Sequence, residues 1–399
     1  MKKALTYSWL LVVFMLALSA CGSASAPKPT TAPVPAATAQ PTVAATAVAT
    51  TAATEAATEA ATAAVTAAAT SVITGTATIT GTVTITGTVT ATQTITGTAV
   101  VTGTAVVTGT AAPAVDLSKV KIAVVMKGPG SANPFWAAVE GGANDAGKAL
   151  GVTVTVQAPP TESDTPSQIA IIEDDITKGV SAIAIAPTDP AALEPVLKKA
   201  IAAGIKVVFI DTKGQNAGVT FIGTNNEVGA ALAGKYICDN LKPGDKVAIL
   251  QGIITQSTGK ARADGSKAAL TACGINVVAE VPGDWQPASG QANMEDILTK
   301  NPDLKGVFAS NDNMAIGATQ AIKNAKLTGK ILVVGFDANP DAATAILAGE
   351  MNATIAQSPA NIGKFGVESL IKLIKGETLD PIIDTGTELV TKDNAAKYK

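Results

Sequence analysis

The sequence contains no histidine, one arginine and three cysteines among its 399 residues. Without histidine the chain lacks the usual acid and base of neutral pH and the commonest metal ligand, which excludes histidine-dependent hydrolase triads and zinc sites. The formal net charge is only −3, and there is no basic run that would favour nucleic acid as a partner. We therefore expect a protein that is not an enzyme, needs no cofactor or metal and does not bind nucleic acid.

The first residues have the pattern of an export signal. Two lysines follow Met1, a largely apolar run extends from residue 8 to residue 18, and Leu-Ser-Ala-Cys occupies 18–21. This apolar run is too short to span a bilayer, as is usual for a secretory signal. The last four residues resemble a bacterial lipobox, which predicts a signal peptide over 1–20 and a lipid anchor on Cys21, outside the cytoplasm. The alternative is an ordinary signal peptide in which Cys21 is incidental.

The next segment, 21–117, is dominated by alanine, threonine, valine, proline and glycine. ITGT or VTGT recurs in it, often at a spacing of six residues. Few bulky apolar side chains are available to build a core, so we expect a disordered Thr/Ala-rich tether to the membrane. A small β-solenoid based on the six-residue period is the alternative.

Short β-branched runs alternate with longer stretches of helical period after Asp116. Strands are expected at 121–126, 152–157, 182–186, 206–211, 246–251, 276–281, 306–310 and 331–336. Helices are expected at 134–150, 166–179, 190–203, 227–241, 260–273, 288–300, 313–325, 340–349 and 360–375. This alternation predicts an α/β fold with two doubly wound, Rossmann-like lobes built on parallel sheets. Asn133, a capping box over 165–168 and Asp189 are expected to start helices.

Rare side chains follow the predicted strands. Parallel sheets bind ligands beyond the carboxyl ends of their strands. Trp136 and Trp285 are the only tryptophans after the export signal, and both come soon after a strand end. Their flat faces suit the C–H face of a sugar ring. The only arginine, Arg262, has a planar fork that can donate two parallel hydrogen bonds to neighbouring oxygens.

Two cysteines remain beyond the signal. Cys238 and Cys273 each lie near the end of a predicted helix. Outside the cytoplasm they could form a disulfide if their Cα atoms come close enough. Two buried thiols are the alternative, and the sequence leaves both open.

Six motifs in a fixed order carry a resemblance to a known family. They read ANPFW, FIDT, KARADG, FASNDNMAIGA, VVGFDANPD and ATIAQSPANIG. With these motifs the chain resembles periplasmic sugar-binding proteins of the ribose-binding type from Lys119 to Val390. The resemblance implies a periplasmic-binding-protein-like fold of type I, whose two lobes are joined by three hinge segments. It also implies a monomer that closes on a monosaccharide or sugar alcohol and delivers it to the permease of an ABC transporter.

The resemblance also implies the extent of each lobe and the binding residues. The first lobe would comprise 118–224 completed by 357–386, and the second 225–356 completed by 387–399. The implied ligand-binding residues are Asn133, Phe135, Trp136, Asp211, Arg262, Trp285, Asn311, Phe336, Asp337 and Gln357. Six of them have a structural alternative: Asn133 as a helix cap, the two phenylalanines as packing residues, the two aspartates as surface acids and Arg262 as a surface arginine. Asp312 is interpreted as a helix cap.

Three departures from the ribose-binding pattern concern the first lobe. The first loop is longer, Ala186 stands where an asparagine is expected, and Thr212 follows Asp211 where an arginine is common. These departures favour a pyranose, another pentose or a sugar alcohol over ribose.

Two other functions were weighed against sugar import. The sequence GPGSAN at 128–133 is superficially like a dinucleotide loop, but the third glycine position holds Asn133, which argues against an enzyme. A ligand-sensing protein is the second alternative. It would bind a sugar or an autoinducer-like furanose and dock on a chemoreceptor or sensor kinase, using the same closed surface.

Overall fold

The computed structural model describes residues 84–86, 104–106 and 115–399. The predicted signal peptide, the lipid anchor at Cys21 and most of the predicted tether lie outside these residues. Two short strands of the tether region, β1 (Thr84–Thr86) and β2 (Thr104–Val106), pair antiparallel. A solenoid built on the six-residue period would stack its strands in parallel, which this pair does not do. In the part of the chain that is described, no helix has the length and apolar character needed to cross a bilayer.

The first lobe is built on a six-stranded parallel sheet with the strand order β13-β7-β6-β5-β3-β4. Its strands are β3 (Lys121–Val125), β4 (Thr153–Gln157), β5 (Ala182–Ile185), β6 (Lys206–Ile210), β7 (Phe221–Gly223) and β13 (Ile382–Asp384). Its helices are α1 (Pro134–Leu150), α2 (Thr165–Thr177), α3 (Pro190–Ala202) and α9 (Pro359–Ile374). One core lies between the sheet and α1 with α9, and a second lies between the sheet and α2 with α3.

The second lobe repeats this plan with a four-stranded parallel sheet in the order β11-β10-β8-β9. Its strands are β8 (Lys246–Gln251), β9 (Asn276–Pro282), β10 (Gly306–Ala309) and β11 (Leu332–Val334), and β12 (Thr354–Ala356) pairs antiparallel with β14 (Glu388–Val390) beside them. Its helices are α4 (Asn226–Asn240), α5 (Ser257–Ala272), α6 (Pro287–Lys300), α7 (Asp312–Asn324) and α8 (Pro340–Ala348). Cores lie on both faces of this sheet as well.

The chain passes between the two lobes three times: after β7, before α9, and between β13 and β14. Counted from β4 in the first sheet and from β9 in the second, each sheet has the second strand of its lobe at the edge, followed by the first and the third, which is a doubly wound arrangement. The predicted fold class is therefore confirmed. All eight predicted strands and nine predicted helices occur, whereas the short strands β7, β12, β13 and β14 were not predicted.

Two of the three predicted helix starts are confirmed. The Asn133 side chain accepts a hydrogen bond from the Phe135 amide, and that of Asp189 caps α3. The capping box over 165–168 is wrong, because Asp164 caps α2 by accepting from the Ser167 amide. Gln168 is buried instead, and it donates to the carbonyls at the ends of β3 and β5 rather than to its own helix.

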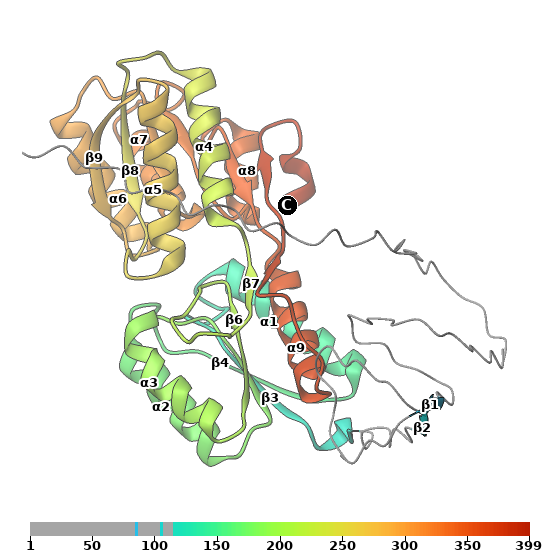
Figure 1. The fold of residues 1–399 in the computed structure, drawn as a ribbon. Helices are drawn as coiled ribbons and strands as arrows, with labels where there is room; N and C mark the ends of the chain where they lie inside the picture. The colour runs from blue at the N-terminus through green and yellow to red at the C-terminus, as the bar shows by residue number, and fades with distance from the viewer. Residues whose placement is uncertain (1–83, 87–103, 107–114) are drawn as a thin grey trace, which may run out of the picture. The chain divides into compact units, whose positions relative to one another are not determined.

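Helices α1 and α9 lie side by side, although they come from opposite ends of the described chain (Figure 1). Glycine permits this approach: a Cβ atom at Gly142 would stand 1.9 Å from the Ala360 carbonyl oxygen, and one at Gly363 would stand 2.0 Å from that of Val139. The contact fixes α9, and with it the crossing segment that precedes α9, against the first lobe.

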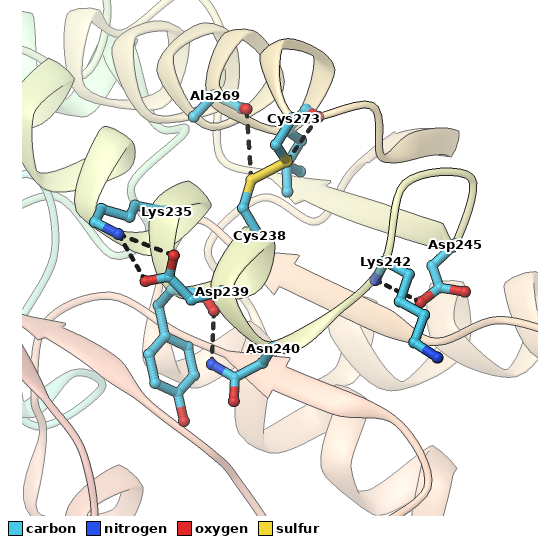
Figure 2. Close-up of a disulfide and its surroundings, with 10 residues drawn as sticks. Lys235, Cys238, Asp239, Asn240, Lys242, Asp245, Ala269 and Cys273 are labelled. Carbon is cyan, nitrogen blue, oxygen red and sulfur yellow. Dashed lines mark hydrogen bonds and ion pairs between the residues drawn. A yellow bond between two sulfur atoms is a disulfide. The ribbon is translucent and has the colours of Figure 1, made fainter.

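A disulfide joins Cys238 near the end of α4 to Cys273 just after α5, with a Cα–Cα distance of 6.1 Å (Figure 2). Of the two alternatives left open by the sequence, the structure has the bridged one. The disulfide lies at the C-terminal end of α5. A helix rises about 1.5 Å per residue, so the N-terminus of α5 is about 24 Å away.

Candidate functional site

A cavity lies between the two lobes and is lined by residues from both. The lining residues are Lys127, Asn133, Phe135, Trp136, Glu162, Asp211, Thr258, Arg262, Trp285, Asn311, Asp337 and Gln357. The cavity thus brings together nine of the ten residues predicted to bind the ligand; Phe336 is the exception.

Three of these residues have an unusual backbone. Asp211, Trp285 and Asp337 have φ angles of 56°, 65° and 130°, which L-residues other than asparagine and aspartate seldom adopt. Asp211 directly follows β6, and Asp337 follows shortly after β11. Such conformations cost on the order of 1–3 kcal/mol each and concentrate at functional sites. The turns beyond these strands therefore hold their side chains in orientations that relaxed backbone would not provide.

The wall from the first lobe combines aromatic faces with a buried carboxylate. The rings of Phe135 and Trp136 meet edge to face, with centroids 4.9 Å apart. Trp136 Nε1 donates to Glu162 Oε1 at 2.8 Å, and Asn133 Nδ2 lies 3.4 Å from the same oxygen. Asn133 thus caps α1 and lines the cavity, so its two interpretations are compatible.

Lys127 provides a buried positive charge beside Asp211. Its Nζ lies 3.0 Å from Asp211 Oδ2 and 2.9 Å from Thr212 Oγ1. The family pattern has an arginine where this chain has Thr212, and here the cation comes from Lys127 in the longer first loop. The site therefore keeps a positive charge next to Asp211 but receives it from a different segment.

Arg262 is held in the second-lobe wall by four contacts. Its Nε donates to Asn226 Oδ1 at 2.7 Å, and its Nη1 donates to the Ser310 carbonyl at 2.9 Å and lies 3.4 Å from Asp337 Oδ1. The guanidinium lies 3.8 Å from the centroid of the Phe336 ring. Phe336 is fully buried beneath Arg262 and is absent from the cavity lining, which fits its alternative interpretation as a packing residue. It supports the arginine by a cation–π contact instead.

Burial changes the ionisation of the charged groups in this wall. It lowers the pKa of Arg262, although the nearby Asp337 carboxylate opposes that change. Burial raises the pKa of Asp337 to about 8 against the opposing charge of Arg262, and it raises the pKa of Asp312 to about 6. Two carboxyls in a dry region that share one nearby guanidinium are therefore easier to protonate than exposed ones.

Asp312 does not cap a helix through its side chain as predicted. Asn311 is the cap of α7, because its Oδ1 accepts from the Met314 amide. Asp312 is the first residue of α7 and is buried, where it accepts from Thr354 Oγ1 at 2.6 Å and from the Asn339 amide at 2.8 Å. It ties together the turns that carry Asn311 and Asp337.

Gln357 comes from a crossing segment and has one unused group. Its Nε2 donates to Asp337 Oδ1 at 2.6 Å. Its Oε1 is buried and accepts no hydrogen bond from the described residues. Because buried polar atoms normally have a partner, this oxygen is available to a hydroxyl in the cavity.

Trp285 lies in a space that Gly252 leaves open. A Cβ atom at Gly252 would stand 2.0 Å from the Trp285 ring. The indole Nε1 donates to Gln256 Oε1 at 3.0 Å, and Asn311 Nδ2 donates to the Trp285 carbonyl at 3.2 Å. The indole is therefore fixed by Gly252 and Gln256, and the Trp285 backbone by Asn311.

Residues 122–378 match the model of a periplasmic binding protein domain. The chain belongs to the periplasmic binding protein family. The family consists of solute-binding proteins rather than enzymes and indicates an extracytoplasmic location, and the resemblance carried by the six motifs is confirmed.

Individual relatives of this periplasmic binding protein cover nearly all of its lobes. The D-ribose/D-allose-binding protein of Pseudomonas aeruginosa is 38% identical over 286 residues, which are 68% of this chain and 89% of the relative. A solute-binding protein of Actinobacillus succinogenes solved with bound D-allose is 31% identical, with a TM-score of 0.66 over 70% of this chain and 100% of its own. A solute-binding protein of Agrobacterium vitis solved with bound D-fucose is 34% identical, with a TM-score of 0.67. The match covers 69% of this chain and 97% of that protein.

Three lining residues of the periplasmic binding protein were missed from the sequence: Lys127, Glu162 and Thr258. Lys127 follows β3 after a single residue, so the strand-end rule that found Asp211 could also have found it. Glu162 lies in the loop between β4 and α2, so the same rule also points to it. Thr258 lies in the first turn of α5, ahead of the predicted start of that helix at 260, so it was assigned to a loop.

Proposed function

We propose that this periplasmic binding protein captures a neutral monosaccharide between its lobes and delivers it to the permease of an ABC importer. The observation that carries the proposal is the set of groups around the cavity. Trp136 and Trp285 line it from different lobes, and polar side chains surround them. Aromatic faces suit the apolar face of a sugar ring, while the polar side chains can bond its hydroxyl edge.

The unused oxygens of the site favour a ligand with several donors. Within the described part of the chain, Asp211 Oδ1, Asp337 Oδ2 and Gln357 Oε1 accept no hydrogen bond, whereas the other oxygen of each aspartate does. Each sugar hydroxyl can donate one hydrogen bond, and a bond to the Asp211 carboxylate belongs to the stronger, charge-assisted class. Arg262 can donate to ring or hydroxyl oxygens in return.

The relatives support a monosaccharide as the ligand class. One is named for D-ribose and D-allose, and two solved structures hold D-allose and D-fucose. The first-lobe wall of this chain differs from the ribose-binding pattern at Ala186 and Thr212, and Lys127 and Glu162 add charges there. We therefore expect a pentose other than ribose, a pyranose or a sugar alcohol.

The test is a thermal-shift screen of the full chain against pentoses, hexoses and sugar alcohols, followed by calorimetry on any hit. A ligand at one hundred times its dissociation constant adds about 2.7 kcal/mol of stability, which raises the midpoint by several degrees. We expect one sugar or a few close epimers to give this shift. A screen in which no carbohydrate shifts the midpoint would contradict the proposal.

We further propose that Cys21 carries the lipid anchor and that the monomeric protein diffuses along the membrane outside the cytoplasm. Support comes from the lipobox-like residues before Cys21 and from the extracytoplasmic family. Cells expressing the chain should incorporate labelled palmitate into it, and Cys21→Ser should abolish the label. Equal labelling of both forms would show that the cysteine is not the anchor.

A further inference from the structure

Gln256 occupies the position before helix α5 but does not cap it. Its side chain makes no hydrogen bond to the first turn of the helix. The residue is fully buried at the junction of the two lobes. A side chain at this position often accepts a hydrogen bond from an amide of the first helical turn. Because the Gln256 amide is buried and makes no such bond, it needs other partners.

All four hydrogen-bonding positions of the Gln256 amide are used. Its Oε1 accepts from Lys127 Nζ at 2.8 Å and from Trp285 Nε1 at 3.0 Å. Its Nε2 donates to the carbonyl oxygens of Glu162 and Thr188, each at 3.1 Å. An amide offers two donors and two acceptor positions, so nothing remains unpaired. Three of the four partners belong to the first lobe, whereas Gln256 and Trp285 belong to the second.

Lys127 has no hydrogen left for a ligand. An ammonium carries three N–H donors. Three acceptors lie within 3.0 Å of Lys127 Nζ, on Asp211, Thr212 and Gln256. Lys127 therefore lines the cavity but bonds protein groups from both lobes. Its charge acts on the ligand only through the carboxylate that it holds.

The first-lobe partners of Gln256 are themselves fixed. Gln168 Oε1 accepts from the amide and the hydroxyl of Thr188, and its Nε2 donates to the carbonyls of Met126 and Ala186. The Thr188 carbonyl therefore belongs to a turn that hydrogen bonds to Gln168 hold in place. Thr188 therefore links two buried glutamines, Gln168 of the first lobe and Gln256 of the second, by hydrogen bonds.

We propose that Gln256 is an interlobe clasp, a positioning residue that joins the lobes through protein groups alone and orients Trp285 over the cavity. Opening the cleft would break the three hydrogen bonds from Gln256 to the first lobe together, whereas its bond to the Trp285 indole lies within the second lobe. The clasp raises the fraction of molecules in the binding-competent arrangement, and apparent affinity increases in proportion to that fraction. It goes beyond the proposed function, because it concerns closure in the absence of sugar.

The first experiment measures closure without any ligand. Spin labels are placed on exposed helix positions of different lobes by Lys198→Cys and Lys260→Cys, in full chain carrying Cys21→Ser. Pulsed dipolar spectroscopy then measures the distance between the labels. We expect a population at the closed distance in the parent chain and at least a tenfold loss of it in Gln256→Ala. Equal closed populations in the two proteins would overturn the clasp.

Two further variants serve as a control and a second test. Gln320→Ala removes an exposed glutamine of the same lobe and should leave the closed population unchanged. Lys127→Met removes one of the three first-lobe partners while leaving Gln256 in place, so it tests the clasp even if Gln256→Ala fails to fold. We expect it to reduce the closed population; an unchanged population would count against the clasp.

A second readout uses the sugar found in the thermal-shift screen, so it rests on the proposed function. Gln256→Ala should weaken its binding about tenfold, mainly through faster dissociation, because the closed complex loses the bonds that delay opening. The labelled protein is measured without sugar. A screen that finds no sugar would thus leave the clasp result standing, and the two proposals can fail separately.

Discussion

Arg262 Nη1 lies 3.4 Å from Asp337 Oδ1, and both side chains are buried in the second-lobe wall of the cavity. This separation is longer than an ideal charge-assisted hydrogen bond. Arg262 has closer partners in Asn226 and the Ser310 carbonyl, and Asp337 has a closer partner in Gln357. The pair is thus held apart by its neighbours, which leaves each group able to bond a ligand.

Replacing Arg262 by lysine should weaken sugar binding at least tenfold, which corresponds to about 1.4 kcal/mol. Lysine keeps the charge but loses the planar fork, the stacking on Phe336 and the simultaneous bonds to two partners. Calorimetric titration of the full chain measures the loss. Lys260→Ala on the exposed side of the same helix is the matched control and should bind normally. An affinity of Arg262→Lys within twofold of the parent would refute the role of the fork.

The two buried carboxyls should make the sugar-free protein less stable as pH rises. Folding raises the pKa of Asp312 to about 6 and that of Asp337 to about 8, whereas an unfolded aspartate has a pKa of 3.8. Between these values the native state binds more protons than the unfolded chain. Their contribution to stability is therefore complete below about pH 3.8 and is lost as pH rises through the two folded values.

Urea unfolding of Asp312→Asn against the parent isolates the first of these groups. An asparagine cannot ionise, so the difference in unfolding free energy between the two proteins should change between pH 4 and pH 7 and then level off. Asp341→Asn, at an exposed acid in the first turn of α8, is the control. A difference that stays constant across this range would show that Asp312 titrates normally.

Residues that directly follow strands were the predictable part of the site. Asp211 and Asp337 come after buried apolar runs, so their place at the carboxyl edge of a parallel sheet could be inferred from order alone. For Phe336 the sequence left open whether it lines the cavity or packs beneath it. It lies beneath Arg262, while Asp337 faces the cavity.

Contacts across the lobes were not predictable in this way. The role of Gln256 depends on the carbonyls of Glu162 and Thr188, which lie far from it in the sequence and in the other lobe. The periodicity of apolar residues along the sequence cannot predict a contact between such distant residues. The strands β7 and β12 are only three residues long, which is too short for a hydrophobic period to be recognised.

Gly252→Ala should weaken sugar binding by displacing Trp285. The added Cβ would stand 2.0 Å from the indole ring, so the ring has to move away from its position over the cavity. We expect a tenfold or larger loss of affinity and a change in tryptophan fluorescence. Gly141→Ala is the matched control, because nothing lies within 4 Å of a Cβ there and alanine favours a helix. Unchanged affinity in Gly252→Ala would show that the indole position does not matter for binding.

The disulfide should stabilise the second lobe without affecting the site. It closes a loop with a sequence separation of 35 residues, and such cross-links typically add about 2–4 kcal/mol by restricting the unfolded chain. The free energy of unfolding of the double variant Cys238→Ser/Cys273→Ser should therefore be lower by this amount, so that it unfolds at a lower urea concentration. Its sugar affinity should stay within twofold of the parent. Affinity should persist because the cysteines lie at the C-terminal ends of α4 and α5, whereas Arg262 and Thr258 line the cavity from the N-terminal part of α5. Cys21→Ser, which removes a cysteine outside the bridge, controls for the loss of a thiol. A large loss of affinity in the double variant would mean that the bridge also sets the position of α5 at the cavity.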